Sequence, residues 1–194
     1  YGIISKVENL NKNQILVTSG ADSALKLIFE ALIKKKDKII ITDPSFAMYD
    51  IYSKLFDTNC LRLRYIKEND RFKLKIDILK KLVKNNKIKA IFLPNPDSPS
   101  GHVFNTSELK NLINFCNEKL IFLIIDEAYY PFHNVTSINL IKKYDNLIVV
   151  RTGSKSFGLA GLRVGFIAAN SKIISLISKY RPIYVISSLS NKFY

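Results

Sequence analysis

One loop of the chain places a lysine and an arginine among small residues. In residues 149–166, VVRTGSKSFGLAGLRVGF, an apolar run opens into a loop that carries Lys155 and then Arg163. Serines and glycines flank the lysine, so a flat ligand can approach the backbone closely. Desolvation or a nearby cation lowers a lysine pKa, and the free amine can then attack a carbonyl carbon to form a Schiff base. The loop therefore predicts a nucleophilic Lys155 in a pocket, with Arg163 as a bidentate anion partner; a solvated lysine in a glycine-containing turn is the alternative.

Two further loops offer groups to a ligand. Residues 18–23, TSGADS, end an apolar run and begin a helical pattern. Because a helix start presents free N–H groups, we expect those of Ala21 and Asp22 to bind a phosphate, while the Asp22 side chain caps the helix. In residues 43–49, DPSFAMY, Phe46 offers an aromatic face for stacking. An ordinary helix cap, and core positions for Phe46 and Tyr49, are the alternatives.

Two predicted strand ends carry an amide and two carboxylates. In residues 92–101, FLPNPDSPSG, prolines and a glycine fix a turn that holds Asn95 where its amide can donate to an oxygen. A loop kept rigid for packing is the alternative. The strand in LIIDEAYY, residues 123–130, ends in Asp126 and Glu127, and a buried acid needs a partner. Successive strand side chains point to opposite faces, which argues against a hydrolase that uses these two carboxylates as a pair.

Apolar runs and helical patterns alternate along the chain, and this order predicts the fold class. Runs rich in β-branched residues and bounded by turn residues predict strands at 14–18, 38–42, 60–65, 90–93, 120–125, 147–150 and 164–169. Helical spacing predicts helices at 24–32, 76–83 and 106–116, the last capped by its opening Thr-Ser-Glu. The pattern indicates an α/β fold, a mostly parallel sheet sandwiched by helices. Ligands of such sheets bind beyond the carboxyl ends of the strands, where the loops above begin.

Composition and charge argue against several classes of protein. The 194 residues are 47% hydrophobic, and no apolar run is long enough to cross a bilayer. The net charge of +14 comes from short lysine groups at the polar ends of periodic segments, so we expect solvated helix ends and no nucleic-acid partner. Cys60 and Cys116 make neither a disulfide framework nor a metal cluster, which favours a cytoplasmic protein without a metal. Residue 1 is Tyr, and we expect a fragment of a longer protein.

Several segments resemble one enzyme family. TGSKSFGLAGLRVGF resembles the cofactor-lysine segment of the pyridoxal-5′-phosphate (PLP) enzymes of the aspartate aminotransferase fold, class I/II, and most closely that of the histidinol-phosphate aminotransferases. SGADSALKLIF is similar to the family's phosphate loop, and NPDSPSG to its Asn-Pro-x-x-Pro-Thr-Gly motif. Ser23, Ser100 and Gly153 depart from the usual Glu, Thr and larger apolar residue. The resemblance implies a large PLP-binding domain at 1–180, with 181–194 as the start of a link to a small domain that is largely absent.

The resemblance also implies roles for the candidate residues. Lys155 would carry PLP and move the substrate proton, and Asp126 would keep the pyridine nitrogen protonated. Phe46 would stack on the ring, and Asn95 with Tyr129 would hold the 3′-oxygen. The Asn95–Pro96 peptide can be cis in relatives. The phosphate would be held by four residues: Ala21, Asp22, Ser154 and Arg163. Lys155, Asp126 and Tyr129 are thus the expected catalytic residues.

The activity implied is transamination of an amino acid or phosphorylated amine. Histidinol phosphate with 2-oxoglutarate is the first expectation, which would place the chain in histidine biosynthesis. A threonine-phosphate decarboxylase, or an aminotransferase for another amine, is the alternative enzyme. An inactive fragment or a basic binding module is the non-enzymatic alternative. The resemblance further implies a homodimer, in which a substrate-binding arginine of the small domain and a tyrosine of the partner subunit lie outside this chain.

Overall fold

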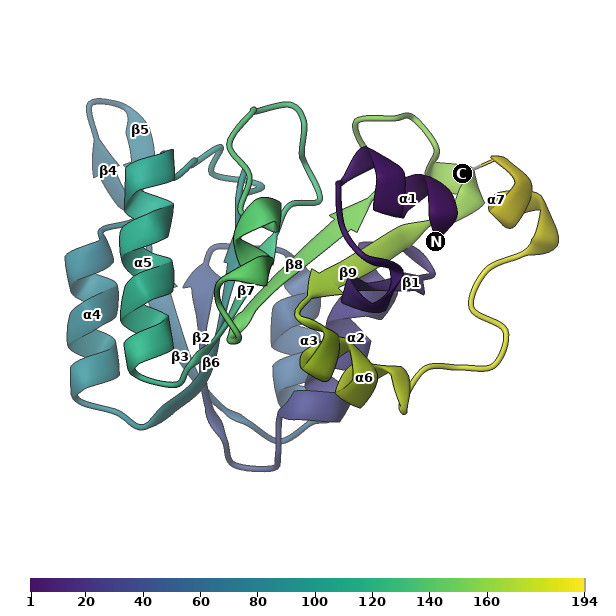
Figure 1. Ribbon diagram of the computed structural model, residues 1–194. Helices are drawn as coiled ribbons and strands as arrows, with labels where there is room; N and C mark the ends of the chain where they lie inside the picture. Colours follow the sequence, from purple (N-terminus) through teal and green to yellow (C-terminus); the bar gives the residue numbers. More distant parts are fainter. Residues whose placement is uncertain (194) are drawn as a thin grey trace.

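Seven apolar segments pair into one sheet in the computed structural model, which describes residues 1–193 (Figure 1). The order across the sheet is β1-β9-β8-β7-β6-β2-β3. The five strands β3, β2, β6, β7 and β8 are parallel to one another. Strand β9 is antiparallel to both β8 and β1. The predicted mostly parallel sheet is therefore confirmed. The bounds are β1 (Ile15–Thr18), β2 (Lys38–Asp43), β3 (Asn59–Arg64), β6 (Ile88–Pro94), β7 (Phe122–Asp126), β8 (Leu147–Thr152) and β9 (Gly165–Ala169).

Helices cover both faces of the sheet. One core contains apolar residues of α2 (Gly20–Leu32), α3 (Ala47–Leu55) and α6 (Ser171–Ser178). The other contains residues of α1 (Gly2–Val7), α4 (Ile76–Lys84), α5 (Thr106–Glu118) and the 3-10 helix η2 (Ile138–Lys142). In Figure 1, α4 and α5 lie in front of the sheet and α2 and α3 behind it. The remaining elements are η1 (Lys12–Gln14), the hairpin of β4 (Ile66–Glu68) and β5 (Arg71–Lys73), η3 (Ala160–Leu162) and α7 (Ser188–Phe193).

Alternation along the strands decides which side chains meet at the carboxyl edge. In β7, Leu123 and Ile125 belong to the core under α4 and α5, while Ile124 belongs to the core under α2 and α3. The same period places Asp126 on the α2 and α3 side and Glu127 on the opposite side. None of the helices within residues 1–193 has the length and apolar character that crossing a bilayer requires.

One predicted boundary and two predicted helix caps are wrong for local reasons. The strand predicted from residue 120 begins at Phe122, because Leu120 ends the turn after α5 with a φ of 55° and an exposure of 88%. Asn105, rather than Thr106, caps α5, since the Asn105 side chain accepts the Glu108 N–H at 2.9 Å. Helix α2 begins at Gly20 with Ser19 as its N-cap, so the prediction that Asp22 caps it is also wrong.

Candidate active site

The loops beyond the carboxyl ends of β2, β6, β7 and β8 surround one pocket together with the first turn of α2. All the residues proposed from sequence line this pocket except Asn95, which is buried between two prolines of the lining. Thr152, Ser98 and Ala128 also line it and were not singled out from the sequence. The complete lining is Ala21, Asp22, Phe46, Pro94, Pro96, Ser98, Asp126, Ala128, Tyr129, Thr152, Ser154, Lys155 and Arg163.

Asp126 is a buried carboxylate at the end of β7 with a tyrosine as its side-chain partner. The Tyr49 hydroxyl donates to Asp126 Oδ2 at 2.8 Å, and the Ala128 N–H donates to Oδ1 at 3.0 Å. Burial raises the pKa of Asp126 to about 6, although both hydrogen bonds act in the opposite direction. A cation in the pocket would stabilise the ionised carboxylate. From the sequence, Tyr49 was considered only as a possible core residue. The one feature that could have indicated a place near the pocket is its position one helical turn after Phe46.

Asn95 presents a free donor from a rigid loop. The side-chain Oδ1 accepts the Phe104 N–H at 2.8 Å, and the backbone N–H of Asn95 donates to the Asp126 carbonyl at 2.8 Å. The side chain is fully buried, and its Nδ2 has no hydrogen-bond partner among residues 1–193. A buried amide donor without a partner is unfavourable, so a ligand oxygen that reached this group would satisfy it. The Asn95–Pro96 peptide is cis.

Arg163 and the start of α2 form the cationic end of the pocket. A Cβ atom on Gly20, whose φ is +77°, would lie 2.9 Å from Arg163 Nη2, so the guanidinium lies directly against this glycine. A Cβ atom on Gly165 would lie 2.6 Å from the Gly20 carbonyl carbon and 2.9 Å from the Ala21 nitrogen. Strand β9 therefore packs against the helix start through a glycine. Backbone N–H groups and a guanidinium at one helix N-terminus favour a phosphate or another anion.

The Lys155 loop connects β8 to β9. The Ser154 N–H donates to Thr152 Oγ1 at 3.2 Å, and Gly153 donates to the Val164 carbonyl at 2.9 Å. Lys155 Nζ lies 5.5 Å from the centre of the Tyr129 ring. The lysine lines the pocket, as the sequence predicted, although the residue as a whole is exposed.

The small residues around this loop do not all contact the pocket. Ser156 donates to the Tyr130 carbonyl at 2.7 Å, away from the lining. Gly158 and Gly161 do not line the pocket, and a Cβ on either would meet nothing within 4 Å. Asp22, predicted as a cap, instead accepts the Tyr52 hydroxyl at 2.8 Å through its Oδ1. Only part of the predicted close approach around the lysine is therefore present.

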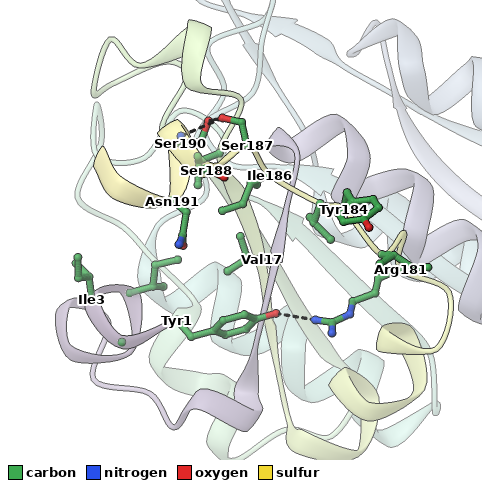
Figure 2. Close-up of a pocket in the computed structure, with 15 residues that line it drawn as sticks. Tyr1, Ile3, Val17, Arg181, Tyr184, Ile186, Ser187, Ser188, Ser190 and Asn191 are labelled. Atoms are coloured by element: carbon green, nitrogen blue, oxygen red, sulfur yellow. Dashed lines mark hydrogen bonds between the residues drawn. The ribbon is translucent and has the colours of Figure 1, made fainter.

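A larger hollow lies between α1 and the segment that leads to α7. Its volume is about 530 Å³, and its one charged lining residue within the described chain is Arg181, which donates to the Tyr1 hydroxyl at 3.2 Å. Figure 2 shows this contact across the floor of the hollow, with Ser187 and Ser190 on the opposite wall. The hollow offers no carboxylate or lysine among residues 1–193, so the smaller pocket around Lys155 is the candidate active site.

The comparisons with known proteins identify the family. The family model described as aminotransferase class I and II matches residues 3–193, and the chain belongs to this family. A histidinol-phosphate aminotransferase of Clostridium kluyveri is 33% identical over 186 residues, which are 96% of this chain and 51% of that protein. The chain thus spans about half the length of the curated relatives it matches.

Solved structures agree with the predicted fold. A PLP-dependent aminotransferase from Streptococcus suis has a TM-score of 0.84 and 26% identity, covering 97% of this chain and 51% of that one. The L-threonine-O-3-phosphate decarboxylase of Porphyromonas gingivalis has a TM-score of 0.82 and 22% identity, covering 97% of this chain and 54% of that one. The second similarity shows the fold alone. The family and the fold class expected from the sequence are both confirmed.

Proposed function

We propose that this chain binds PLP and contributes the cofactor half of an aminotransferase active site. The observation that carries the proposal is the meeting of Lys155, Asp126 and Arg163 in one pocket beside the start of α2. These are the groups that an aldehyde, a protonated ring nitrogen and a phosphate would each require. When bound, PLP supplies an electron sink for the substrate Cα and carries the amino group from an amine to a 2-oxo acid.

The residues present fit this cofactor. The buried Asp126 carboxylate suits a protonated ring nitrogen, and the unpartnered Asn95 Nδ2 suits the 3′-oxygen together with the Tyr129 hydroxyl. Phe46 is 45% exposed at the pocket wall, where its ring can pack on a flat ligand. The phosphate would be held by Arg163, Ser154 and the N–H groups of Ala21 and Asp22.

The work of the reaction would fall on three side chains. The Lys155 amine would hold the aldehyde carbon of the cofactor until a substrate amine takes its place. The freed Lys155 amine would then carry a proton from the substrate Cα to that aldehyde carbon. Asp126 would hold the proton on the ring nitrogen. Asn95 would orient the 3′-oxygen through the donor that the structure leaves free.

We propose histidinol phosphate as the amine and 2-oxoglutarate as the acceptor. The name of the Clostridium kluyveri relative supports this substrate, whereas the phosphothreonine decarboxylase shares only the fold. The proposal includes a large domain at 1–180, a link at 181–194 toward a small domain, and a homodimer. It also includes a cytoplasmic location, which the free thiols of Cys60 and Cys116 support.

The cofactor is tested by titrating the purified chain with PLP, reducing with borohydride and mapping the labelled peptide. We expect absorbance changes that saturate and a label on Lys155. Lys155→Ala should lose the label, and the control Lys172→Ala, at an exposed lysine of α6, should keep it. A folded chain that takes up no PLP, or takes it up equally on many surface lysines, would favour the basic binding module instead.

The substrate is tested on the PLP-loaded chain without a 2-oxo acid. Histidinol phosphate is expected to convert the cofactor to pyridoxamine phosphate, which chromatography detects. Threonine phosphate is expected to release no carbon dioxide. The reverse result would identify the decarboxylase alternative, and conversion by a different amine alone would keep transamination but reject histidinol phosphate.

A further inference from the structure

We propose that Tyr49 is a positioning residue that holds and orients the Asp126 carboxylate toward the ring nitrogen of the cofactor. This inference rests on the proposed function, because it assigns Tyr49 to the same pocket. The two residues come from different elements, α3 and the end of β7, and meet through the 2.8 Å hydrogen bond from the Tyr49 hydroxyl to Asp126 Oδ2.

The Tyr49 ring is fixed on several sides. It is fully buried, and its centre lies 5.9 Å from that of Phe92 and 6.1 Å from that of Phe46, the latter in an edge-to-face arrangement. A buried ring with such contacts has little rotational freedom, so its hydroxyl stays directed at the carboxylate. Tyr49 therefore connects the acid with Phe46, the residue proposed to pack on the ring face.

The Tyr49 hydrogen bond lowers the pKa of Asp126 and so favours its ionised form. Desolvation raises the pKa of Asp126, the nearby Asp97 raises it further, and the Tyr49 and Ala128 donors lower it. The other charged groups of the pocket lining are Asp22, Lys155 and Arg163. Without the Tyr49 donor the carboxylate would take up a proton more readily, and a neutral acid cannot keep a ring nitrogen protonated as a carboxylate does.

The main variant is Tyr49→Phe, which removes the hydroxyl and keeps the buried ring. Tyr144→Phe is the matched control, because the Tyr144 hydroxyl is bound to Asn114 in the core outside the pocket. We expect Tyr49→Phe to weaken PLP binding about tenfold, as for the loss of one hydrogen bond to a charged group. NMR of PLP labelled at its ring nitrogen should show lost protonation in Tyr49→Phe and an unchanged signal in the control.

Two further measurements separate this inference from the proposed function. Carboxyl-carbon NMR of the chain without PLP should show that Tyr49→Phe moves the Asp126 titration about one pH unit higher. In an Asp126→Asn background, Tyr49→Phe should no longer change PLP affinity. An unchanged titration and ring-nitrogen signal in a chain that does attach PLP to Lys155 would overturn the inference. The expected titration shift in a chain that never attaches PLP would instead overturn the proposed function and leave the contact in place.

Discussion

Asp126 and Glu127 are adjacent in the chain, yet they lie in opposite kinds of environment. Asp126 faces the pocket, with one hydroxyl and one N–H as its partners. Glu127 is fully buried on the other face of the sheet, where its Oε2 accepts from Arg151 Nε at 3.0 Å and from the Thr136 hydroxyl at 2.7 Å. Its Oε1 accepts the Ser137 N–H at 2.6 Å. One carboxylate is left available to a ligand, and the other is fully committed to the protein.

The network around Glu127 extends to the first helix. Arg151 Nη1 lies 2.7 Å and 2.8 Å from the two carboxylate oxygens of Glu8, so one buried guanidinium joins β8, β7 and the end of α1. The Tyr130 ring covers the same guanidinium, with Arg151 Cζ 3.7 Å from its centre. Buried charges that satisfy one another are structural, whereas a buried acid with no cation partner among residues 1–193 favours a ligand site.

The largest expected effect is on the stability of the fold and comes from the network around Glu127. Glu127→Gln removes one of the two carboxylates that contact the buried Arg151 guanidinium and leaves Glu8 as its other partner. Arg151 and the Ser137 N–H lose a charged acceptor, so we expect the free energy of unfolding to fall by about 2–3 kcal/mol, measured by urea denaturation. Glu118→Gln, at an exposed position of α5, is the control and should change it by less than about 0.5 kcal/mol. Equal effects of the two variants would show that the network does not stabilise the fold.

An effect of opposite sign, and of at most similar size, is expected at Asp126. The folded chain binds the Asp126 proton more tightly than the unfolded chain, since its pKa is about 6 against an ordinary value of 3.8. Wild-type stability should therefore fall as pH rises between about 4 and 6, by at most about 3 kcal/mol, and Asp126→Asn should lack this loss. Urea denaturation of both chains on either side of this range measures the difference. An Asn variant that is less stable than the wild type at neutral pH would contradict a carboxylate destabilised by burial.

The sequence was sufficient for those parts of the site that depend on strand ends. Lys155, Asn95 and Asp126 each follow an apolar run, and parallel strands bring such positions to one edge of a sheet. The opposite directions of Asp126 and Glu127 also followed from the period of two along a strand. These features are local, so spacing and residue type can predict them.

Features that depend on distant contacts could not be predicted in this way. Tyr49 meets Asp126 only because α3 packs over the end of β7, and Glu8 meets Arg151 only because α1 returns to the sheet. Helix α1 has six residues, which is too short for a clear helical period. The antiparallel direction of β9 could not be predicted either, since the residue pattern of an apolar strand does not depend on the direction in which the strand runs. The exposure of Lys155 depends on the surrounding loops and not on its own neighbours in the sequence.

The smallest expected effects come from two aromatic rings, Phe46 at the pocket and Tyr130 over the Arg151 guanidinium. Phe46→Leu should weaken PLP binding roughly 2- to 10-fold through loss of ring packing, with little change in unfolding free energy, because Phe46 is half-exposed. Tyr130→Leu should do the reverse, lowering the unfolding free energy by about 1–2 kcal/mol through loss of the packed guanidinium contact while PLP affinity stays near that of the wild type.

Phe72→Leu is the control for both variants, since this ring is about as exposed as Phe46 and lies on the β4–β5 hairpin outside the pocket. Fluorescence titration with PLP and urea denaturation of the three variants measure the two quantities separately. If Phe46→Leu lowered stability and Tyr130→Leu lowered PLP affinity, the division between a ligand side and a structural side of β7 would be wrong. If each variant changed only its own quantity, the two faces of one strand end would be energetically independent, as expected for sites without shared partners.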